Sequence, residues 1–241
     1  MINVLIYGYS GALGQVVEKL VMQDENFNIC AKINSKSNIF DCDTTLDVII
    51  DCSTAKAIPN LLDYAKKNNV PVVLCTTGLD LDTENMIAES SKSIAIFKSA
   101  NMSLGINLIS GILKQISPTL KNAGFDIEIL EKHHNKKIDA PSGTAMMLAD
   151  TINESLDNTL EYTYDRSEQR NKRKESEIGF SSIRGGTIVG EHTVIFAGNG
   201  EVIEIKHSAL SKELFAVGAI NAAKFIVGKN AGIYGFSHLM Q

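Results

Sequence analysis

The stretch Gly8-Tyr9-Ser10-Gly11-Ala12-Leu13-Gly14 decides the fold of this chain. It directly follows an apolar run at residues 3–7 and precedes a segment, residues 13–21, in which apolar side chains recur at helical spacing. A glycine-rich turn between a strand and a helix lets the backbone approach a pyrophosphate closely, because its N–H groups and the positive helix end attract the anion. The stretch predicts a dinucleotide-binding βα unit, and a tight turn without a ligand is the alternative.

The rest of the first hundred residues continues this pattern. Further apolar runs at residues 28–33, 47–51, 70–75 and 94–97 alternate with amphipathic segments. This rhythm is typical of βαβ units, in which helices cover both faces of a parallel sheet. The first part of the chain is therefore predicted to be an α/β, Rossmann-like domain.

The pattern changes after Asn101. Helices are predicted at residues 103–120 and near 144–156, and strands at 125–129 and around 180–184, 187–197 and 202–207. These segments indicate an inserted α+β domain with a mixed or mostly antiparallel sheet. An apolar stripe between Phe215 and Ile226 indicates a helix that returns to the first domain. We therefore expect a dinucleotide-binding domain at residues 1–103 and 212–241, and the inserted domain at 104–211.

The composition argues against several classes of protein. The 241 residues carry 23 Lys and Arg against 28 Asp and Glu, so a net charge of -5 lacks the basic excess that nucleic-acid binding needs. The uncharged stretch at residues 99–113 falls short of the ~20 apolar residues that cross a bilayer. No secretory signal is visible, so the cytoplasm is the expected compartment. The cysteines show neither disulfide nor metal spacing and are expected to be reduced: Cys30, Cys42, Cys52 and Cys75.

The second predicted strand ends where dinucleotide-binding proteins usually carry an acidic residue for the ribose hydroxyl groups. Here the place holds Asn34, with Lys32 and Lys36 nearby. Asn34 can hydrogen-bond a ribose and either lysine could meet a 2′-phosphate, which favours NADPH or the use of both NADPH and NADH. The alternative is that all three are ordinary polar loop residues.

Two further loops follow predicted parallel strands. They contain Cys75, Thr76, Thr77 and Gly78, and Ser99, Ala100, Asn101 and Met102. Open α/β sheets bind ligands at the carboxyl ends of their strands, and these small side chains and backbone amides suit a nicotinamide carboxamide. Ordinary turns are the alternative for both loops.

The densest group of ionisable residues is Glu131-Lys132-His133-His134-Asn135-Lys136-Lys137-Ile138-Asp139-Ala140-Pro141-Ser142-Gly143-Thr144. Adjacent histidines on an extended segment point to opposite sides and no cysteine lies near them, so no metal site is predicted. Acid–base or anion-binding roles are favoured. The turn at residues 142–144 begins a predicted helix, and its amides and hydroxyl groups would bind a carboxylate, although Ser142 can also be a plain N-cap.

Residues 166–174 form the most conspicuous charge run, with five basic residues and one glutamate. The favoured interpretation is a solvated helix or loop, because the overall charge opposes a nucleic-acid role. The alternative is an electropositive rim that attracts anionic ligands.

The segment at residues 131–145, EKHHNKKIDAPSGTA, resembles the signature of the 4-hydroxy-tetrahydrodipicolinate reductase (dihydrodipicolinate reductase) family. Other segments agree with the family in order: residues 8–14, 76–78 (TTG), 100–103 (ANMS), 183–186 (IRGG) and 190–192 (GEH). The resemblance spans essentially the whole chain. It implies a Rossmann domain completed by the C-terminal segment, and an inserted domain that binds substrate and mediates formation of a homotetramer.

By this resemblance, the chain reduces a cyclic dicarboxylate, 4-hydroxy-tetrahydrodipicolinate, to tetrahydrodipicolinate with NADPH or NADH, in lysine and diaminopimelate biosynthesis. His133 resembles the proton donor and Lys137 the second catalytic donor. His134, Gly143 and Thr144 resemble substrate contacts, to which the helix-start argument adds Ser142. Cofactor contacts are expected from Gly8, Tyr9, Ser10, Gly11, Ala12, Leu13, Asn34, Lys36, Cys75, Thr76, Thr77, Ser99, Ala100, Asn101 and Met102.

The nucleotide loops depart from the family pattern. Cys75 stands where glycine is common, Ala12 where arginine is common, and Asn34 where an acidic residue is common. Two other functions stay open. A non-catalytic NAD(P)-sensing protein would have an eroded His/Lys cluster, whereas here the cluster is intact. A reductase of another small carboxylic acid is the second alternative.

Overall fold

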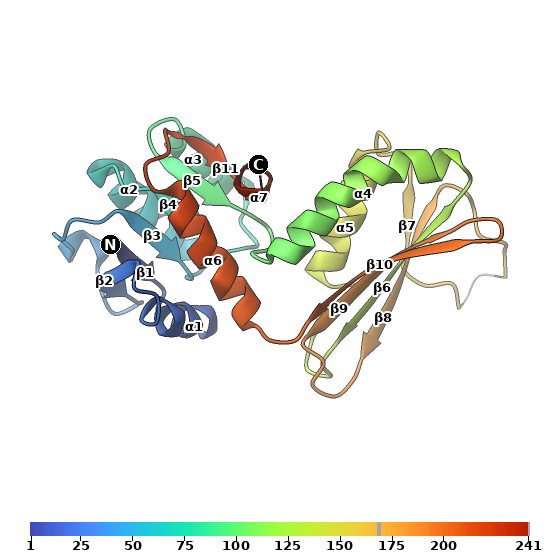
Figure 1. Ribbon diagram of the computed structural model, residues 1–241, viewed down its shortest axis with the longest axis horizontal. Coiled ribbons are helices and arrows are strands. Elements are labelled where there is room, and N and C mark those ends of the chain that lie inside the picture. The colour runs from blue at the N-terminus through green and yellow to red at the C-terminus, as the bar shows by residue number, and fades with distance from the viewer. Residues whose placement is uncertain (168–169, 241) are drawn as a thin grey trace. The chain divides into compact units, whose positions relative to one another are not determined.

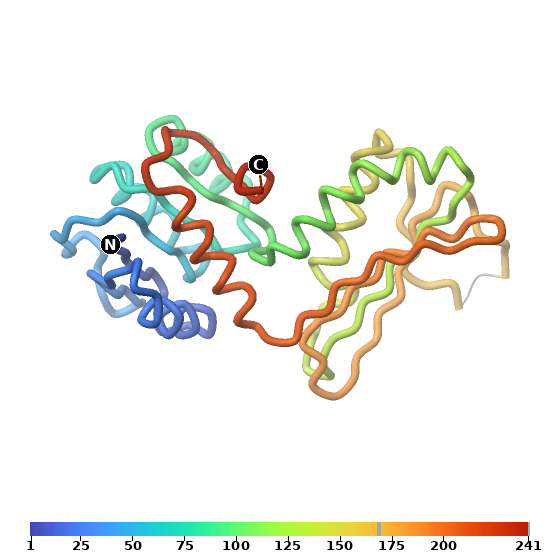
Figure 2. The backbone as a smooth tube through the Cα atoms, viewed as in Figure 1, coloured from blue at the N-terminus to red at the C-terminus, as the bar shows by residue number. Residues whose placement is uncertain are grey.

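The computed structural model describes residues 1–167 and 170–240. The chain forms two compact units, Met1–Leu104 with Glu213–Gln241, and Gly105–Lys212. Figure 2 follows the backbone out of the first unit into helix α4 (Leu104–Asn122) and back into it through α6 (Glu213–Ile226). The first unit is therefore built from two separated parts of the chain.

The first unit contains a six-stranded parallel sheet in the order β11-β5-β4-β3-β1-β2 (Figure 1). Its strands are β1 (Ile2–Tyr7), β2 (Phe27–Ile33), β3 (Val48–Asp51), β4 (Val72–Leu74), β5 (Ala95–Lys98) and β11 (Gly232–Tyr234). Its helices are α1 (Ala12–Val21), α2 (Ile58–Asn68), α3 (Leu81–Ser90), α6 and α7 (Phe236–Leu239), with short 3-10 turns η1 (Ile39–Asp41) and η2 (Ala55–Ala57). Strand β3 is buried throughout, as expected for a central strand of a parallel sheet covered on both faces.

Two hydrophobic cores lie on the two faces of this sheet. One joins Val4 and Ile6 of β1 to α1 and α6, and the other joins Leu5 to α2 and α3. Successive strand residues point to opposite faces, so the division follows from the strand geometry. Helix α6 packs closely against the loop after β5 because it presents small residues there. A Cβ on Gly218 would lie 1.7 Å from the carbonyl oxygen of Met102 in that loop.

The strand order reverses at β1, because β2 lies on one side of it and β3 on the other. Ligands of open α/β sheets bind beyond the carboxyl ends of the strands at such a point. The loops after β1 and β3 are therefore the expected ligand site of this unit.

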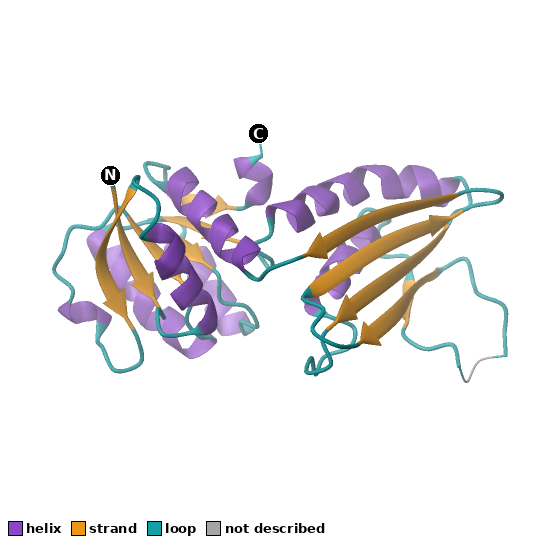
Figure 3. Cartoon of the chain, turned by 60° about the horizontal axis from the view of Figure 1, so that its bottom comes forward, coloured by secondary structure: helices purple, strands orange, loops and turns teal. Residues whose placement is uncertain are grey.

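The second unit has a five-stranded mixed sheet in the order β10-β9-β6-β8-β7, covered on one face by α4 and α5 (Gly143–Glu154) (Figure 3). The strands are β6 (Asp126–His133), β7 (Glu161–Thr163), β8 (Glu177–Arg184), β9 (Gly190–Ala197) and β10 (Val202–Ala209). Strand β8 pairs in parallel with β6 and β7, whereas β9 pairs antiparallel with β6 and β10. Ile127 and Ile129 of β6 point into the core, and Glu131 and His133 continue along the same buried side.

The expected fold class, a Rossmann-like parallel-sheet domain with a second α+β domain, is confirmed. Strands β7 and β11 and helix α7 were not predicted, because segments of three or four residues are too short to show a periodicity. Within the described ranges, no helix combines the length and the apolar character that a membrane span requires.

Candidate functional site

The loop after β1 requires its glycines. Gly8 has a φ of +86°, and a Cβ there would lie 2.6 Å from the carbonyl oxygen of Cys52. A Cβ on Gly14 would lie 2.4 Å from the carbonyl oxygen of Gly8. Close packing of β1, α1 and the loop after β3 thus excludes a side chain at both positions. Gly11 is the N-cap of α1 and has no capping side chain, so N–H groups of the first helical turn can donate to an anion.

A cavity of about 290 Å³ opens beside this loop. It is lined by Tyr7, Gly8, Ser10, Gly11, Asn34, Ser35, Cys52, Ser53, Thr54 and Ala57. Four of these, Gly8, Ser10, Gly11 and Asn34, are among the residues expected to bind the cofactor. Sequence reasoning missed the loop at residues 52–54. A signal was present, because this loop also follows a parallel strand at the carboxyl edge of the sheet.

Asp51, the last residue of β3, joins two of the loops at this edge. It is fully buried, and its carboxyl group accepts hydrogen bonds from the Ser53 N–H (3.0 Å), the Ser53 hydroxyl (2.5 Å) and the Thr76 N–H (3.2 Å). Burial raises the pKa of Asp51, and the bonds from Ser53 and Thr76 oppose that rise only in part. Asp51 therefore ties the loop after β3 to the loop after β4.

The residues expected to select the cofactor follow β2. The Asn34 amide donates to the Tyr9 hydroxyl (3.2 Å), and its oxygen accepts from the Lys36 N–H (2.9 Å). Both lysines are exposed, and the Lys32 ammonium pairs with Glu18 at 2.7 Å. Lys32 is thus already neutralised by a carboxylate, and Lys36 offers an exposed cation in this loop.

The other predicted cofactor residues lie outside the lining of the cavity: Tyr9, Ala12, Leu13, Lys36, Cys75, Thr76, Thr77, Ser99, Ala100, Asn101 and Met102. The loops that contain Thr76 and Asn101 follow β4 and β5, and so lie at the same carboxyl edge of the sheet. Met102 differs, because its side chain is buried in the hydrophobic core shared with α6. A contact from Met102 to the cofactor would therefore come from its backbone.

In the second unit, Glu131 and His133 form a buried pair. Glu131 is fully buried, and its Oε2 atom lies 2.6 Å from Nδ1 of His133. Arg184 donates to both oxygens of Glu131, at 2.8 and 2.6 Å. Burial alone would raise the pKa of Glu131, but the bonds from Arg184 and His133 outweigh it and lower the pKa to about 2. Burial lowers the pKa of His133, while Glu131 acts in the opposite direction.

Ser142 connects this pair to α5. Its hydroxyl caps the helix by accepting from the Ala145 N–H (3.2 Å), and its own N–H donates to Glu131 (3.1 Å). The same hydroxyl is 2.9 Å from Nε2 of His192, whose pKa is lowered to about 4, chiefly by burial. Although several histidines gather here, no group of three or more His, Cys, Asp or Glu side chains in residues 1–167 and 170–240 could hold a metal ion.

Lys137 and the first residue of α5 both contact the carboxylate of Asp139. The Lys137 ammonium lies 2.8 Å from Oδ1 of Asp139. This bond is the largest cause of the lowered pKa of Asp139, and the Gly143 N–H contributes in the same direction. A Cβ on Gly143 would meet nothing within 4 Å, so the space beside the helix start is open. The predicted contacts His134 and Thr144 belong to the same segment, in the turn after β6 and the first turn of α5.

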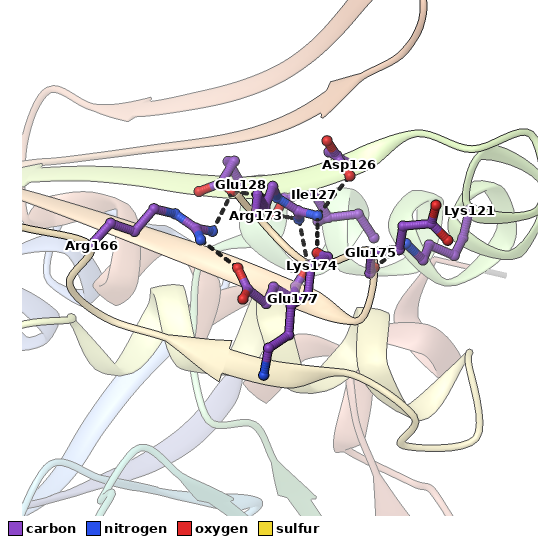
Figure 4. A network of polar contacts seen from close by, with 9 residues as sticks. All are labelled: Lys121, Asp126, Ile127, Glu128, Arg166, Arg173, Lys174, Glu175 and Glu177. Carbon is purple, nitrogen blue, oxygen red and sulfur yellow. Dashed lines mark hydrogen bonds and ion pairs between the residues drawn. The ribbon is translucent and has the colours of Figure 1, made fainter. Parts of the chain in front are cut away.

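The basic run is not a solvated segment throughout, as Figure 4 shows. Arg166 bonds Glu128 and Glu177, and Arg173 bonds Asp126 and Glu128. Arg173 also donates to the backbone carbonyl oxygens of Ile127 and Glu177, so its guanidinium fastens the segment to β6 and β8. The expectation of a solvated run is wrong for these two arginines, because acidic side chains from distant strands pair with them. Residues 168 and 169 of the run lie outside the described residues.

A separate cavity of about 460 Å³ lies beside Arg166. It is lined by Glu128, Ala140, Pro141, Tyr164, Asp165, Arg166, Phe180, Ser181 and Ser182. None of the residues predicted to act on the substrate lines it. The predicted catalytic residues therefore do not belong to this cavity.

Comparisons with known proteins agree over the whole chain. Models described as "Dihydrodipicolinate reductase, N-terminus" and "Dihydrodipicolinate reductase, C-terminus" match residues 2–102 and 105–240. The 4-hydroxy-tetrahydrodipicolinate reductase of Caldanaerobacter subterraneus subsp. tengcongensis is 47% identical and covers 100% of this chain and 99% of its own length. That of Clostridium novyi is 48% identical, over 97% of this chain and 96% of the relative.

A solved structure has the same fold. The dipicolinate-bound dihydrodipicolinate reductase from Paenisporosarcina sp. TG-14 matches with a TM-score of 0.76 and 22% sequence identity, over 99% of both chains. The structural match extends over both units, as do the two family models. The chain belongs to the dihydrodipicolinate reductase family.

Proposed function

We propose that the chain reduces 4-hydroxy-tetrahydrodipicolinate to tetrahydrodipicolinate with NADPH or NADH, in lysine and diaminopimelate biosynthesis. The reaction consumes a hydride and a proton and releases water. Family membership and the names of the relatives support the proposal. The observation that carries the residue assignments is the carboxylate of Asp139, held by Lys137 in the segment that also contains His133. Donors that hold this carboxylate can hold that of a substrate.

A nicotinamide cofactor fits the first unit, and when bound it supplies the hydride. The uncapped start of α1 and the close approach at Gly8 suit a pyrophosphate, because a backbone without side chains there exposes N–H groups. Asn34 and Lys36 would bind the adenosine end. The loops after β4 and β5 are proposed for the nicotinamide end, through Cys75, Thr76, Thr77, Ser99, Ala100, Asn101 and the backbone of Met102.

His133 is the proposed acid. Hydride addition to an electron-poor conjugated imine leaves negative charge, which a positioned acid neutralises by proton transfer. Lys137 is the second donor: its ammonium group binds a substrate carboxylate and supports the same charge.

Substrate carboxylates are proposed to bind Gly143, Thr144 and His134 together with Lys137. Ser142 receives a narrower role than expected. Its N–H donates to Glu131, and its hydroxyl is engaged with the Ala145 N–H and His192. We therefore assign Ser142 to capping α5 and holding the turn, rather than to direct contact with substrate.

The test follows NAD(P)H absorbance while the substrate is generated from pyruvate and aspartate semialdehyde. We expect substrate-dependent oxidation by the wild-type chain and turnover ~10²–10⁴-fold lower in His133→Ala and Lys137→Ala, with cofactor binding nearly intact. The matched control is Lys136→Ala, which removes an exposed lysine from the same segment and should leave turnover within about twofold. Near wild-type turnover in both catalytic variants would contradict the assignments.

Assembly and compartment are further proposals from the family resemblance. We expect a homotetramer in the cytoplasm, and neither nucleic acid nor a membrane as a partner. Sedimentation equilibrium of the purified chain measures the first expectation, and a mass equal to one chain would contradict it. Cell fractionation measures the second.

A further inference from the structure

The carboxylate of Glu131 contacts both parts of the proposed catalytic segment. Its Oε2 atom is 2.6 Å from Nδ1 of His133. Its Oε1 atom accepts from the N–H of Ser142, the residue that caps α5, at 3.1 Å. Arg184 bonds both oxygens and so holds the plane of the carboxylate. One fully buried group therefore determines the relative placement of the proposed acid and the helix start.

The charge of Glu131 decides which nitrogen of His133 carries a proton. The Arg184 guanidinium keeps this carboxyl group ionised, and an ionised carboxylate can only accept hydrogen bonds. Nδ1 of His133 must therefore be the donor in the 2.6 Å contact, whether the ring is neutral or cationic. A proton that leaves the cationic ring can then come only from Nε2, the ring atom that faces Gly190.

Other charged and titratable groups around His133 do not compete for Nδ1. Lys137 and Arg184 act on the ring through their positive charges and disfavour its cationic form. The ring of His192 lies 5.2 Å from that of His133, edge to face, and its Nε2 atom is engaged with Ser142. Glu131 is the neighbour that favours the cation.

We propose that Glu131 is a positioning residue that holds His133 as the Nδ1–H tautomer and directs its acidic proton to Nε2. This inference rests on the proposed function of His133 as the acid. In the step, the Nε2–H bond of the cationic ring breaks and the proton passes to the reduced substrate. The ring remains neutral with Nδ1–H bonded to Glu131, and a solvent proton later restores Nε2–H.

The decisive variant is Glu131→Gln. Its amide oxygen can still accept from Arg184 and Ser142, but its NH2 group would face Nδ1 and favour the opposite tautomer, because an NH2 group donates. We expect kcat to fall ~10²–10⁴-fold, as when the carboxylate that orients a catalytic histidine is replaced by an amide. Binding of dipicolinate, measured by calorimetry, should change less than ~3-fold.

The tautomer is measured directly in 15N-histidine-labelled chain, with the His133 signals assigned by comparison with His133→Asn. Wild type should show protonated Nδ1 and bare Nε2 in the neutral ring, and Glu131→Gln should show the reverse. The matched control is Glu177→Gln, since Glu177 is also buried and bonded to an arginine, Arg166, in the same unit. This control should keep both the His133 tautomer and kcat within about twofold.

Protonated Nδ1 and a kcat within twofold of wild type in Glu131→Gln would overturn the proposal. An equal loss of kcat in Glu177→Gln would overturn it too, because the loss would then follow from neutralising any buried glutamate that is bonded to an arginine in this unit. If Glu131→Gln does not fold, Glu131→Asp keeps the charge for Arg184 but withdraws the carboxylate by one methylene, and the His133 signals must still change. Failure of the proposed function is distinguishable: wild type would then oxidise no cofactor, whereas the tautomer is read without turnover.

Discussion

Asp51 in the first unit and Glu131 in the second are both fully buried, and both accept backbone N–H groups from a following loop. Their electrostatics are opposite. Asp51 bonds neutral groups of Ser53 and Thr76, and burial raises its pKa. Glu131 bonds the Arg184 guanidinium, and its pKa falls to about 2. Burial by itself does not decide the charge of a carboxyl group, because the partners that it is given can reverse the effect.

The difference suits the two proposed roles. Burial acts on Asp51 in the direction of the neutral carboxyl group, near a loop proposed to bind an anionic cofactor, where an ionised carboxylate would repel phosphate. A lowered pKa at Glu131 keeps an acceptor beside His133, so that one ring nitrogen is always the donor. Each unit thus uses a buried carboxyl group to fasten loops, and the partners of that group set the direction of its pKa shift.

The largest expected effect comes from removing the cationic partner. Arg184→Met leaves Glu131 buried without its counter-charge and should lower the free energy of unfolding by ~3–5 kcal/mol. Asp51→Asn should cost less, ~1–3 kcal/mol, because Ser53 and Thr76 bond different oxygens of Asp51, so that the single amide oxygen of asparagine leaves one of these donors unpaired. Urea unfolding followed by circular dichroism measures both. Equal losses of unfolding free energy in the two variants would contradict the inference that the two carboxyl groups differ through their partners.

The pH dependence of stability should have opposite signs at the two sites. Glu131 has a pKa near 2 in the folded chain against 4.5 ordinarily, so it contributes stability above pH 4.5 that is lost as the pH falls toward 2. The difference between wild type and Glu131→Gln should therefore grow as the pH rises through this window, by ~3 kcal/mol at most. For Asp51 the folded pKa is raised, so its contribution is present below 3.8 and is lost as the pH rises above that value.

These opposite slopes are measured by repeating the urea unfolding of wild type, Glu131→Gln and Asp51→Asn at several pH values. The difference between wild type and Asp51→Asn should shrink as the pH rises above 3.8. Slopes of the same sign would show that burial, and not the partner, controls both groups.

The smallest expected effect concerns the choice between NADPH and NADH. We attribute this choice to exposed side chains in the loop after β2 and not to the buried Asp51. We expect use of both cofactors with a modest NADPH advantage, to which Lys36 contributes ~0.2–1 kcal/mol. Asn34→Glu should remove the advantage, because a carboxylate repels the 2′-phosphate. Lys36→Ala should reduce it, and Lys32→Ala should change it less, because Lys32 is already paired with Glu18.

The measurement is kcat/KM for NADPH and NADH at low and high salt. The NADPH advantage should shrink as salt rises, because an exposed contact is screened. A strong NADH preference in wild type that neither Asn34→Glu nor Lys36→Ala alters would show that this loop does not select the cofactor.

Sequence reasoning worked best where the requirement is local. Gly8 and Gly14 were singled out by their spacing between a predicted strand and a predicted helix, and the structure shows that a side chain at either position would collide with backbone. For Ser142, expected to bind a carboxylate, a plain N-cap was the alternative because it precedes an amphipathic segment, and it caps α5. Such requirements depend on φ and ψ angles and on neighbours within a few positions, which the chain itself supplies.

Side-chain contacts between distant strands could not be predicted from the sequence. Arg184 bonds Glu131 across 53 positions, and His192 bonds Ser142 across 50. Both residues occur in segments that resembled the family, yet nothing in their spacing shows which side chain they contact. The basic run was misjudged for the same reason, because Arg173 meets Asp126 and Glu128 only once β6 is formed.

The sequence by itself determined the fold class, the glycine loop and the chemical character of residues 131–144, because each depends on residues that are close along the chain. The tertiary structure alone decided which carboxyl group has an arginine beside it and which has only hydroxyl and amide donors. A pKa depends on loss of water and on charges within a few ångströms, and strands distant in sequence supply both. Two acidic residues that look alike in the sequence, Asp51 and Glu131, thus acquire opposite pKa shifts only in the folded chain.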